Sequence, residues 1–138
     1  MVTQKKKRKK PTKTQLKKKA DDYFSKWIRR RDGVCQSTRL QGHGAKNCTR
    51  ERNLQCAHIH TRDYSATRLD PDNAVALCKS CHMFFTQRPL EWRAFINTLF
   101  DDSDYYDRMG RRAFAGAQRL APIDWGKKAE FWRDQWGE

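Results

Sequence analysis

Apolar residues recur at helical spacing close to the N-terminus. The apolar positions are Ala20, Tyr23, Phe24, Trp27 and Ile28. Their intervals of three and four residues place them on one face of a helix. Three arginines follow at positions 29 to 31, where cations suit the helix dipole, and an Asp-Gly pair favours a stop. We therefore expect a helix from Ala20 to about Asp32, with its apolar face in the core.

A different pattern follows after a loop over residues 34–53. Residues 54–59 and 74–77 are short apolar runs typical of strands, separated by a polar segment at 61–73 that is too long for a tight hairpin turn. Helical patterns cover 78–86, 90–100 and 105–120, and Asp124 is placed to cap a last helix. We predict an α+β fold: a small ββα core with an N-terminal basic helix and C-terminal helices.

The last helix carries a stripe of aromatic residues. Its apolar positions are Trp125, Ala129, Trp132 and Trp136. We expect this stripe to pack on the rest of the domain or on a second subunit rather than to stack on bases, and a homodimer is therefore an open alternative.

Charge is concentrated at the N-terminus. The 138 residues carry 30 basic and 16 acidic side chains, a formal net charge of +14, and ten of the basic residues lie in the first 19 positions without an acidic one. Like-charge repulsion keeps such a run extended, so residues 1–19 are predicted to be a disordered basic arm that binds phosphates. A solubilising tail and a nuclear localisation signal are the alternatives.

Length and hydropathy narrow the class of protein. The chain is long enough for one small domain, predicted at 20–100, with a helical extension at 101–138. No apolar run approaches the 18 to 20 residues of a membrane span, and lysines stand where a signal peptide needs apolar residues. We expect a soluble protein with no membrane partner, located in the cytoplasm, or in the nucleus if its source is eukaryotic.

The cysteines indicate a metal site. Five are present, an odd number, and two of them form a Cys-Lys-Ser-Cys knuckle at 78–81. In an intracellular chain this spacing favours metal over a disulfide, and a structural metal would help so small a core. Free buried thiols are the alternative.

The knuckle belongs to a longer motif. Cys56-Ala57-His58-Ile59-His60 is followed by Asn73, and then by the knuckle with His82 directly behind it. This order resembles the HNH, or ββα-metal, nuclease family over about residues 20–100. His58, Asn73 and His82 stand at the three motif positions. Within the family, segments 22–32 and 66–73 are most similar to small phage HNH proteins, including the lambda NinG (Rap) recombination type.

The resemblance implies a structural zinc. Many members carry a second cysteine pair upstream, where this chain has Cys35 and Cys48, so the implied ligands are Cys35, Cys48, Cys78 and Cys81. Twelve residues separate the upstream pair, whereas relatives usually place two between them. His43 or Cys56 could therefore replace one ligand.

The resemblance also implies a catalytic centre. His58 would be the general base that takes a proton from the attacking water, and His82 would bind one Mg²⁺ or Mn²⁺. Asn73 is expected to pin the loop through backbone hydrogen bonds.

This chain departs from the family at one metal ligand. Ala57 stands where relatives have an Asp or His ligand, and His60, on the same strand face as His58, is the candidate replacement. Alternatively, His60 contacts DNA and the ligand is Asp63, Asp70 or water.

Basic side chains are the candidate DNA contacts. Arg62 and Arg68 in the loop are expected to hold phosphates beside the scissile bond, unless Asp63, Asp70 or Asp72 pairs with them. The remaining candidates are Arg29, Arg30, Lys6, Lys7, Arg8 and Lys9.

These observations and the resemblance together predict a metal-dependent DNA endonuclease. Its substrate would be branched recombination DNA, or it would act as a nickase on duplex DNA. The alternative is a non-catalytic, zinc-stabilised DNA-binding module derived from the HNH fold, which Ala57 favours. A third reading assigns the arm to RNA or to partner proteins.

Overall fold

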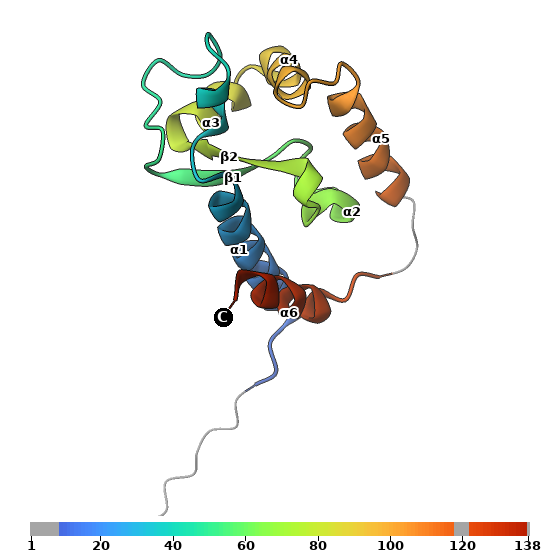
Figure 1. Cartoon of the computed structure of the whole chain (residues 1–138). Coiled ribbons are helices and arrows are strands. Elements are labelled where there is room, and N and C mark those ends of the chain that lie inside the picture. Colours follow the sequence, from blue (N-terminus) through green and yellow to red (C-terminus); the bar gives the residue numbers. More distant parts are fainter. Residues whose placement is uncertain (1–8, 118–121, 138) are drawn as a thin grey trace, which may run out of the picture.

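The computed structural model describes residues 9–117 and 122–137, which form helices around a small antiparallel sheet (Figure 1). The helices are α1 Lys13–Asp32, α2 Ser65–Arg68, α3 Lys79–Thr86, α4 Pro89–Leu99, α5 Tyr105–Ala117 and α6 Trp125–Trp136. The strands are β1 Leu54–His58 and β2 Ala74–Cys78, and short 3₁₀ helices span Gln36–Arg39 and Pro71–Asn73. The predicted α+β class is confirmed. In these two ranges, no helix has both the length and the apolar character needed to cross a membrane.

The two strands pair so that Leu54 lies opposite Cys78 and His58 opposite Ala74. Both strands begin and end within one residue of the predicted bounds. All five β2 residues are buried, because helices cover both faces of the sheet. A two-stranded sheet is marginal alone, so the helices supply most of its stability.

Alternation along β1 gives the two faces different neighbours. Ala57 and Ile59 pack in an apolar cluster with the α4 residues Phe95 and Ile96. Cys56 instead packs in the cluster that contains Phe24 of α1. The hairpin is therefore held between α1 on one side and α3 and α4 on the other.

Helix α1 begins seven residues earlier than predicted. It starts at Lys13, where Thr12 and Gln15 form a reciprocal capping box, and Lys18 pairs with Asp22 one turn on. The prediction of disorder up to residue 19 is therefore wrong for residues 13–19, because capping and packing against α6 outweigh charge repulsion. Residues 1–8 lie outside the described ranges. The predicted stop is confirmed, since Gly33 caps the helix with φ of 72°.

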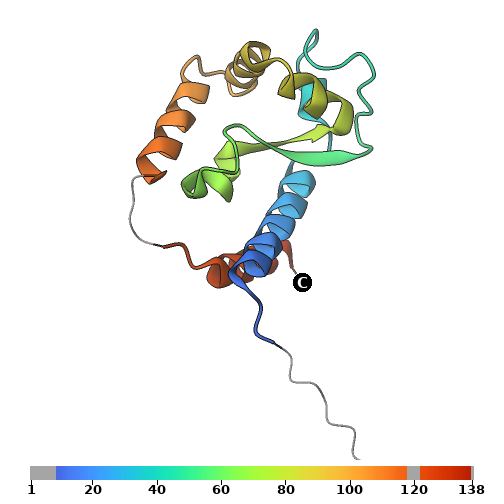
Figure 2. The same ribbon diagram turned by 180° about the vertical axis from the view of Figure 1, so that it is seen from behind.

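Helix α6 lies across α1 (Figure 2). Trp125, Ala129 and Trp132 are buried, and the Trp132 ring meets the Phe24 ring edge-on with centroids 4.9 Å apart. Packing of the stripe on the rest of the chain is thereby confirmed for these three residues. The predicted cap is confirmed as well, because the Asp124 carboxylate accepts from the backbone N–H of Lys127 at 3.1 Å.

Candidate functional site

Four cysteines converge between the loop after α1 and the start of α3. They are Cys35, Cys48, Cys78 and Cys81, and their sulfur atoms all lie within 4.8 Å of one another. A tetrahedral zinc with Zn–S bonds of about 2.3 Å requires sulfurs about 3.8 Å apart. The Sγ atoms of Cys48 and Cys78 are 3.8 Å apart. The cluster can therefore hold a metal ion such as zinc.

This is the predicted set, although twelve residues separate its upstream pair. The two alternative ligands lie elsewhere. The ring of His43 packs near Phe95, with centroids 5.9 Å apart, and Cys56 lies on the α1 side of the sheet. Burial raises the pKa of Cys56 to about 12, as expected of an inert thiol.

A serine hydroxyl and a glycine adjoin the cysteine cluster, and no sequence pattern pointed to either residue. Ser37 Oγ lies 3.1 Å from the sulfur of Cys35, 3.2 Å from that of Cys81 and 3.5 Å from that of Cys48. Gly44 has φ of 92°, and a Cβ there would lie 2.8 Å from the Cβ of Ser37. A hydroxyl so placed can donate to a thiolate and hold the ligands in position.

The thiols differ in acidity. Burial raises the pKa of Cys78, but hydrogen bonds from Cys81 and Thr49 outweigh this and lower the pKa to about 6. Burial raises the pKa of Cys35 and of Cys81. A cation that binds here must therefore displace protons from the buried thiols.

The imidazole of His58 has a fixed orientation. It points toward α1, stacked on Phe24 with centroids 5.8 Å apart, and its Nε2 donates to the backbone oxygen of Arg68 at 2.8 Å. A carbonyl only accepts, so Nε2 carries the hydrogen and Nδ1 keeps a lone pair. Burial lowers the pKa of His58, which favours the neutral ring that a general base requires.

Asn73 pins the loop, as predicted. Its side chain is fully buried; Oδ1 accepts from His60 N at 2.9 Å, and Nδ2 donates to the oxygens of His60 and Thr67 at 3.0 and 3.1 Å. The amide thus joins the end of β1 to α2.

His82 lies on the other side of the sheet from His58. Its Nδ1 donates to Gln55 Oε1 at 2.8 Å, and Gln55 shares a strand face with Ala57 rather than with His58. Nε2 is therefore left with a lone pair, the arrangement typical of metal-binding histidines. Burial lowers the pKa of His82, and its side chain lines a surface groove with Lys79. Gln55 is a site residue that strand alternation could have revealed.

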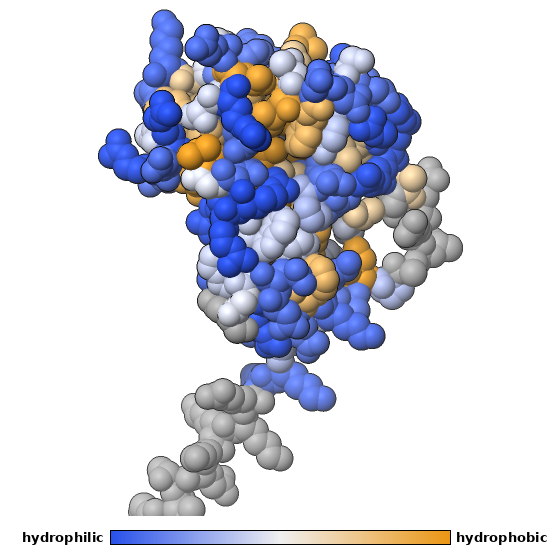
Figure 3. All heavy atoms as spheres, viewed as in Figure 1, coloured by the Kyte–Doolittle hydropathy of each residue, from blue (hydrophilic) through white to orange (hydrophobic). Residues whose placement is uncertain are grey.

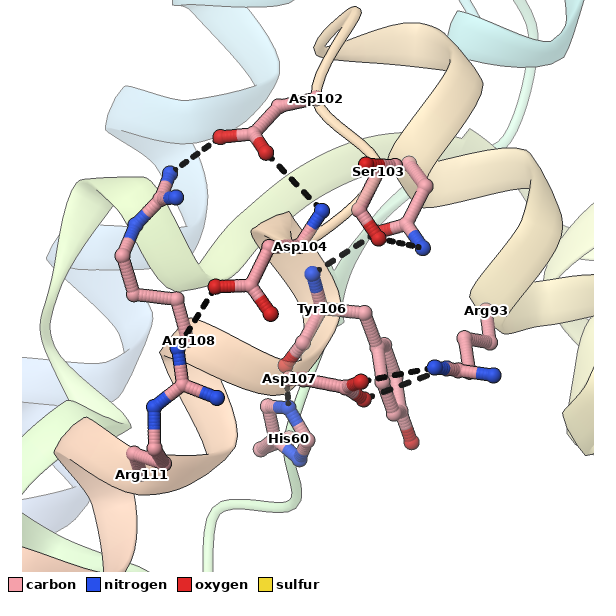
Figure 4. A network of polar contacts seen from close by, with 10 residues as sticks. His60, Arg93, Asp102, Ser103, Asp104, Tyr106, Asp107, Arg108 and Arg111 are labelled. Atoms are coloured by element: carbon pink, nitrogen blue, oxygen red, sulfur yellow. Dashed lines mark hydrogen bonds and ion pairs between the residues drawn. The ribbon is translucent and has the colours of Figure 1, made fainter.

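His60 does not share a site with His82. Its Nε2 donates to the oxygen of Tyr106 in α5 at 2.7 Å (Figure 4). A Cβ on Gly110 would lie 3.1 Å from its ring. His82 is hydrogen-bonded to Gln55, which lies five positions before His60. At about 3.3 Å per residue, these five positions span about 16 Å, so the His60 and His82 rings are far apart. The prediction that His60 replaces the missing ligand is therefore wrong, because its ring docks α5 onto the loop.

The other alternative ligands do not complete a second centre. Asp70 pairs with Arg112 at 2.6 Å, and Ala57 is 1% exposed within the core. Within residues 9–117 and 122–137, the four cysteines are the single group of three or more metal-binding side chains.

Arg68 is committed to a partner that the sequence did not suggest. Its Nε donates to Asp21 Oδ1 at 2.8 Å and its Nη2 pairs with Oδ2, and both side chains are more than four-fifths buried. The prediction that Arg68 holds phosphate is wrong in this structure, because Asp21 of α1 occupies the guanidinium. Arg62 is exposed, and its side chain has no polar partner among the described residues.

The two α1 arginines that we predicted as DNA contacts also have hydrogen-bond partners within the protein. Arg30 donates to the backbone oxygens of Trp136 and Gln135 at 2.9 and 3.0 Å, so it caps α6 and is not the free DNA contact that we predicted. Arg29 Nε donates to the oxygen of Ser25 within the helix. Lys9 is exposed. The predicted contacts Lys6, Lys7 and Arg8 lie outside the described residues.

Comparison of the chain with models of known protein families, with curated proteins and with solved structures found no match.

Proposed function

We propose that this chain is a DNA endonuclease of the HNH type, stabilised by one zinc ion and using His58 as its general base. The observation that carries the proposal is the neutral His58 ring on the β1–β2–α3 unit, held by its Nε2 hydrogen bond with Nδ1 left basic. Asn73 and His82, at the other two motif positions, have partners that suit the roles of a loop anchor and a metal ligand.

The zinc ion would be bound by Cys35, Cys48, Cys78 and Cys81. Thiolates from the loop and from the first turn of α3 would join these two segments, which also meet in the apolar cluster that contains Ala45 and Phe85. The Ser37 hydroxyl and the Ala45 N–H, which lies 3.4 Å from Cys81 Sγ, would stabilise the thiolate charge. This metal would be structural, because four thiolates leave no open position.

His58 would take a proton at Nδ1 from the water that attacks the phosphorus. The Arg68 carbonyl keeps the other nitrogen protonated and fixes the plane of the ring. Its hydrogen bond raises the pKa of His58 and would stabilise the new positive charge, as would Asp21, whereas the charges of Arg62 and Arg68 oppose it. General-base catalysis of this kind contributes about 10² to 10⁴-fold.

The described residues offer only part of a site for Mg²⁺ or Mn²⁺. His82 supplies one nitrogen, Ala57 supplies no ligand atom, and these cations prefer oxygen ligands. A cation bound at His82 would hold a DNA phosphate on the α3 side of the sheet, on the opposite face from His58. The residues present do not complete its shell, so no step of the proposed mechanism passes through it.

Nicking of supercoiled plasmid tests the proposal. Wild-type protein is incubated with magnesium, manganese or nickel and compared with His58→Ala and with His43→Ala, a matched control outside the hairpin. We expect nicking by wild type and by His43→Ala, and at least a 10²-fold loss in His58→Ala. Absence of nicking by wild type, or equal nicking by His58→Ala, contradicts the proposal.

A non-catalytic DNA-binding module is the second candidate, favoured by the buried Ala57 and by the single metal-binding group in the described ranges. Metal titration separates the two. The module predicts one equivalent of zinc and no further site, whereas the endonuclease predicts a second, weaker divalent site that His82→Ala removes.

A further inference from the structure

Unpaired positive charge gathers where the loop over residues 40–53 meets α3. Every described arginine beyond residue 67 is paired with a carboxylate. The exposed side chains of four residues near α3 have no polar partner among the described residues, and we call them the cationic face: Lys46, Arg50, Arg52 and Lys79. The single acidic residue of the loop is Glu51.

These side chains share one surface although they come from different segments. The backbone N–H of Lys79 donates to the oxygen of Asn53 at 3.0 Å, and the loop runs beside α3 in both views (Figures 1 and 2). Hydrophilic side chains project from this edge of the molecule (Figure 3). Unpaired like charges at such an edge repel one another, and a polyanion would relieve that repulsion.

Two grooves meet at the cationic face. One of about 330 Å³ is lined by Asn47 and Ser80, and one of about 280 Å³ by Gln55 and His82; Lys79 and Met83 line both. A phosphate chain that follows the grooves would pass Lys79 and reach His82.

We propose that the cationic face binds the DNA backbone and leads it along α3 to His82. This inference rests on the proposed function for its class of partner, but it assigns the contact surface to loop 40–53 and α3 instead of to Arg30 and Arg68. Phosphate contacts of this kind are independent of sequence and sensitive to salt.

The competing explanation is local. Four thiolates around a zinc ion carry a net charge of −2, and nearby cations could serve to offset that charge. The two explanations differ in what is lost when the cations are removed: DNA affinity in one case and zinc affinity in the other.

Fluorescence anisotropy of a labelled DNA duplex, without added magnesium, measures binding over about 50 to 200 mM salt. Arg52→Ala/Lys79→Ala is compared with Lys127→Ala/Lys128→Ala, a matched pair of exposed, unpartnered lysines on α6. Each lost phosphate contact lowers the salt slope by about 0.9. We therefore expect the salt slope of the first variant to be about 1.8 smaller than that of wild type. Between about 50 and 200 mM salt, the loss of DNA affinity should then be roughly 12-fold smaller for this variant than for wild type. The control should keep the wild-type slope.

Zinc content and thermal unfolding are measured on the same samples. A reduced slope with wild-type zinc content supports the cationic face. An unchanged slope, with or without loss of zinc, overturns it, and so does tighter binding of an RNA duplex of the same sequence. His58→Ala is expected to bind DNA with the wild-type slope, so failure of catalysis is distinguished from failure of this surface. Absence of DNA binding by wild type overturns both proposals.

Discussion

Replacing Asn73 by alanine should destabilise the fold by about 3 kcal/mol. The side chain makes three hydrogen bonds, two to His60 and one to Thr67, and is fully buried. A net value of about 1 kcal/mol per bond gives the total. Water can reach the groups of His60, which are partly buried, but not the carbonyl of Thr67, so we expect about 2 to 4 kcal/mol.

Urea unfolding followed by tryptophan fluorescence measures this change. A loss of 3 kcal/mol lowers the folding constant roughly 150-fold and should shift the midpoint with little change in the urea dependence. The control is Asn47→Ala. Asn47 is exposed, and its side chain has no hydrogen bond in the described part of the chain, so its replacement should cost less than about 0.5 kcal/mol.

Asn73→Asp sharpens the test. The carboxylate keeps the acceptor for the N–H of His60 but loses both donors and brings a negative charge against two carbonyl oxygens. It should destabilise the protein at least as much as alanine does. A loss below about 1 kcal/mol in either variant would refute the assignment of Asn73 as the anchor of the loop.

Three further predictions concern the histidines and the thiols. Gly110→Ala places a Cβ 3.1 Å from the His60 ring, so it should destabilise by about 1 to 3 kcal/mol in thermal unfolding despite the better helix propensity of alanine; a stabilised variant would contradict the close contact. Removal of zinc by a chelator takes away the ion that would join the four thiols, so it should lower the midpoint of thermal unfolding; an unchanged midpoint in zinc-loaded and chelated protein would contradict a structural zinc. Burial lowers the pKa of His58, so below about pH 6.5 the unfolded state binds the extra proton and stability falls toward pH 5. His58→Ala should reduce that fall, and an unchanged pH dependence would count against a buried neutral ring.

Local sequence patterns predicted most elements to within a residue or two. Period-two and period-3.6 patterns depend on neighbours a few positions away, which is why both strands and the start of α4 could be placed. The start of α1 was missed although Thr12 and Gln15 signal it. The run of lysines favours an extended chain, but charge repulsion on an exposed helix is weaker than a capping box combined with packing against α6.

The four cysteines that could hold a metal ion were also predicted from the sequence, through the knuckle at 78–81 and the resemblance. The orientation of the histidines was not. His58 and His82 have the same chemistry at motif positions, yet strand alternation and the placement of α3 put them on opposite faces of the sheet.

What only the tertiary structure decided is which partner each charged or polar side chain takes. Asp21 and Arg68 are 47 positions apart, and His60 and Tyr106 are 46 apart. Several carboxylates stood nearer to Arg68 in sequence, and no local rule separates them. The choice follows from how helices dock on the hairpin, because burial of apolar faces sets the docking and the polar groups then pair with whatever is brought within reach.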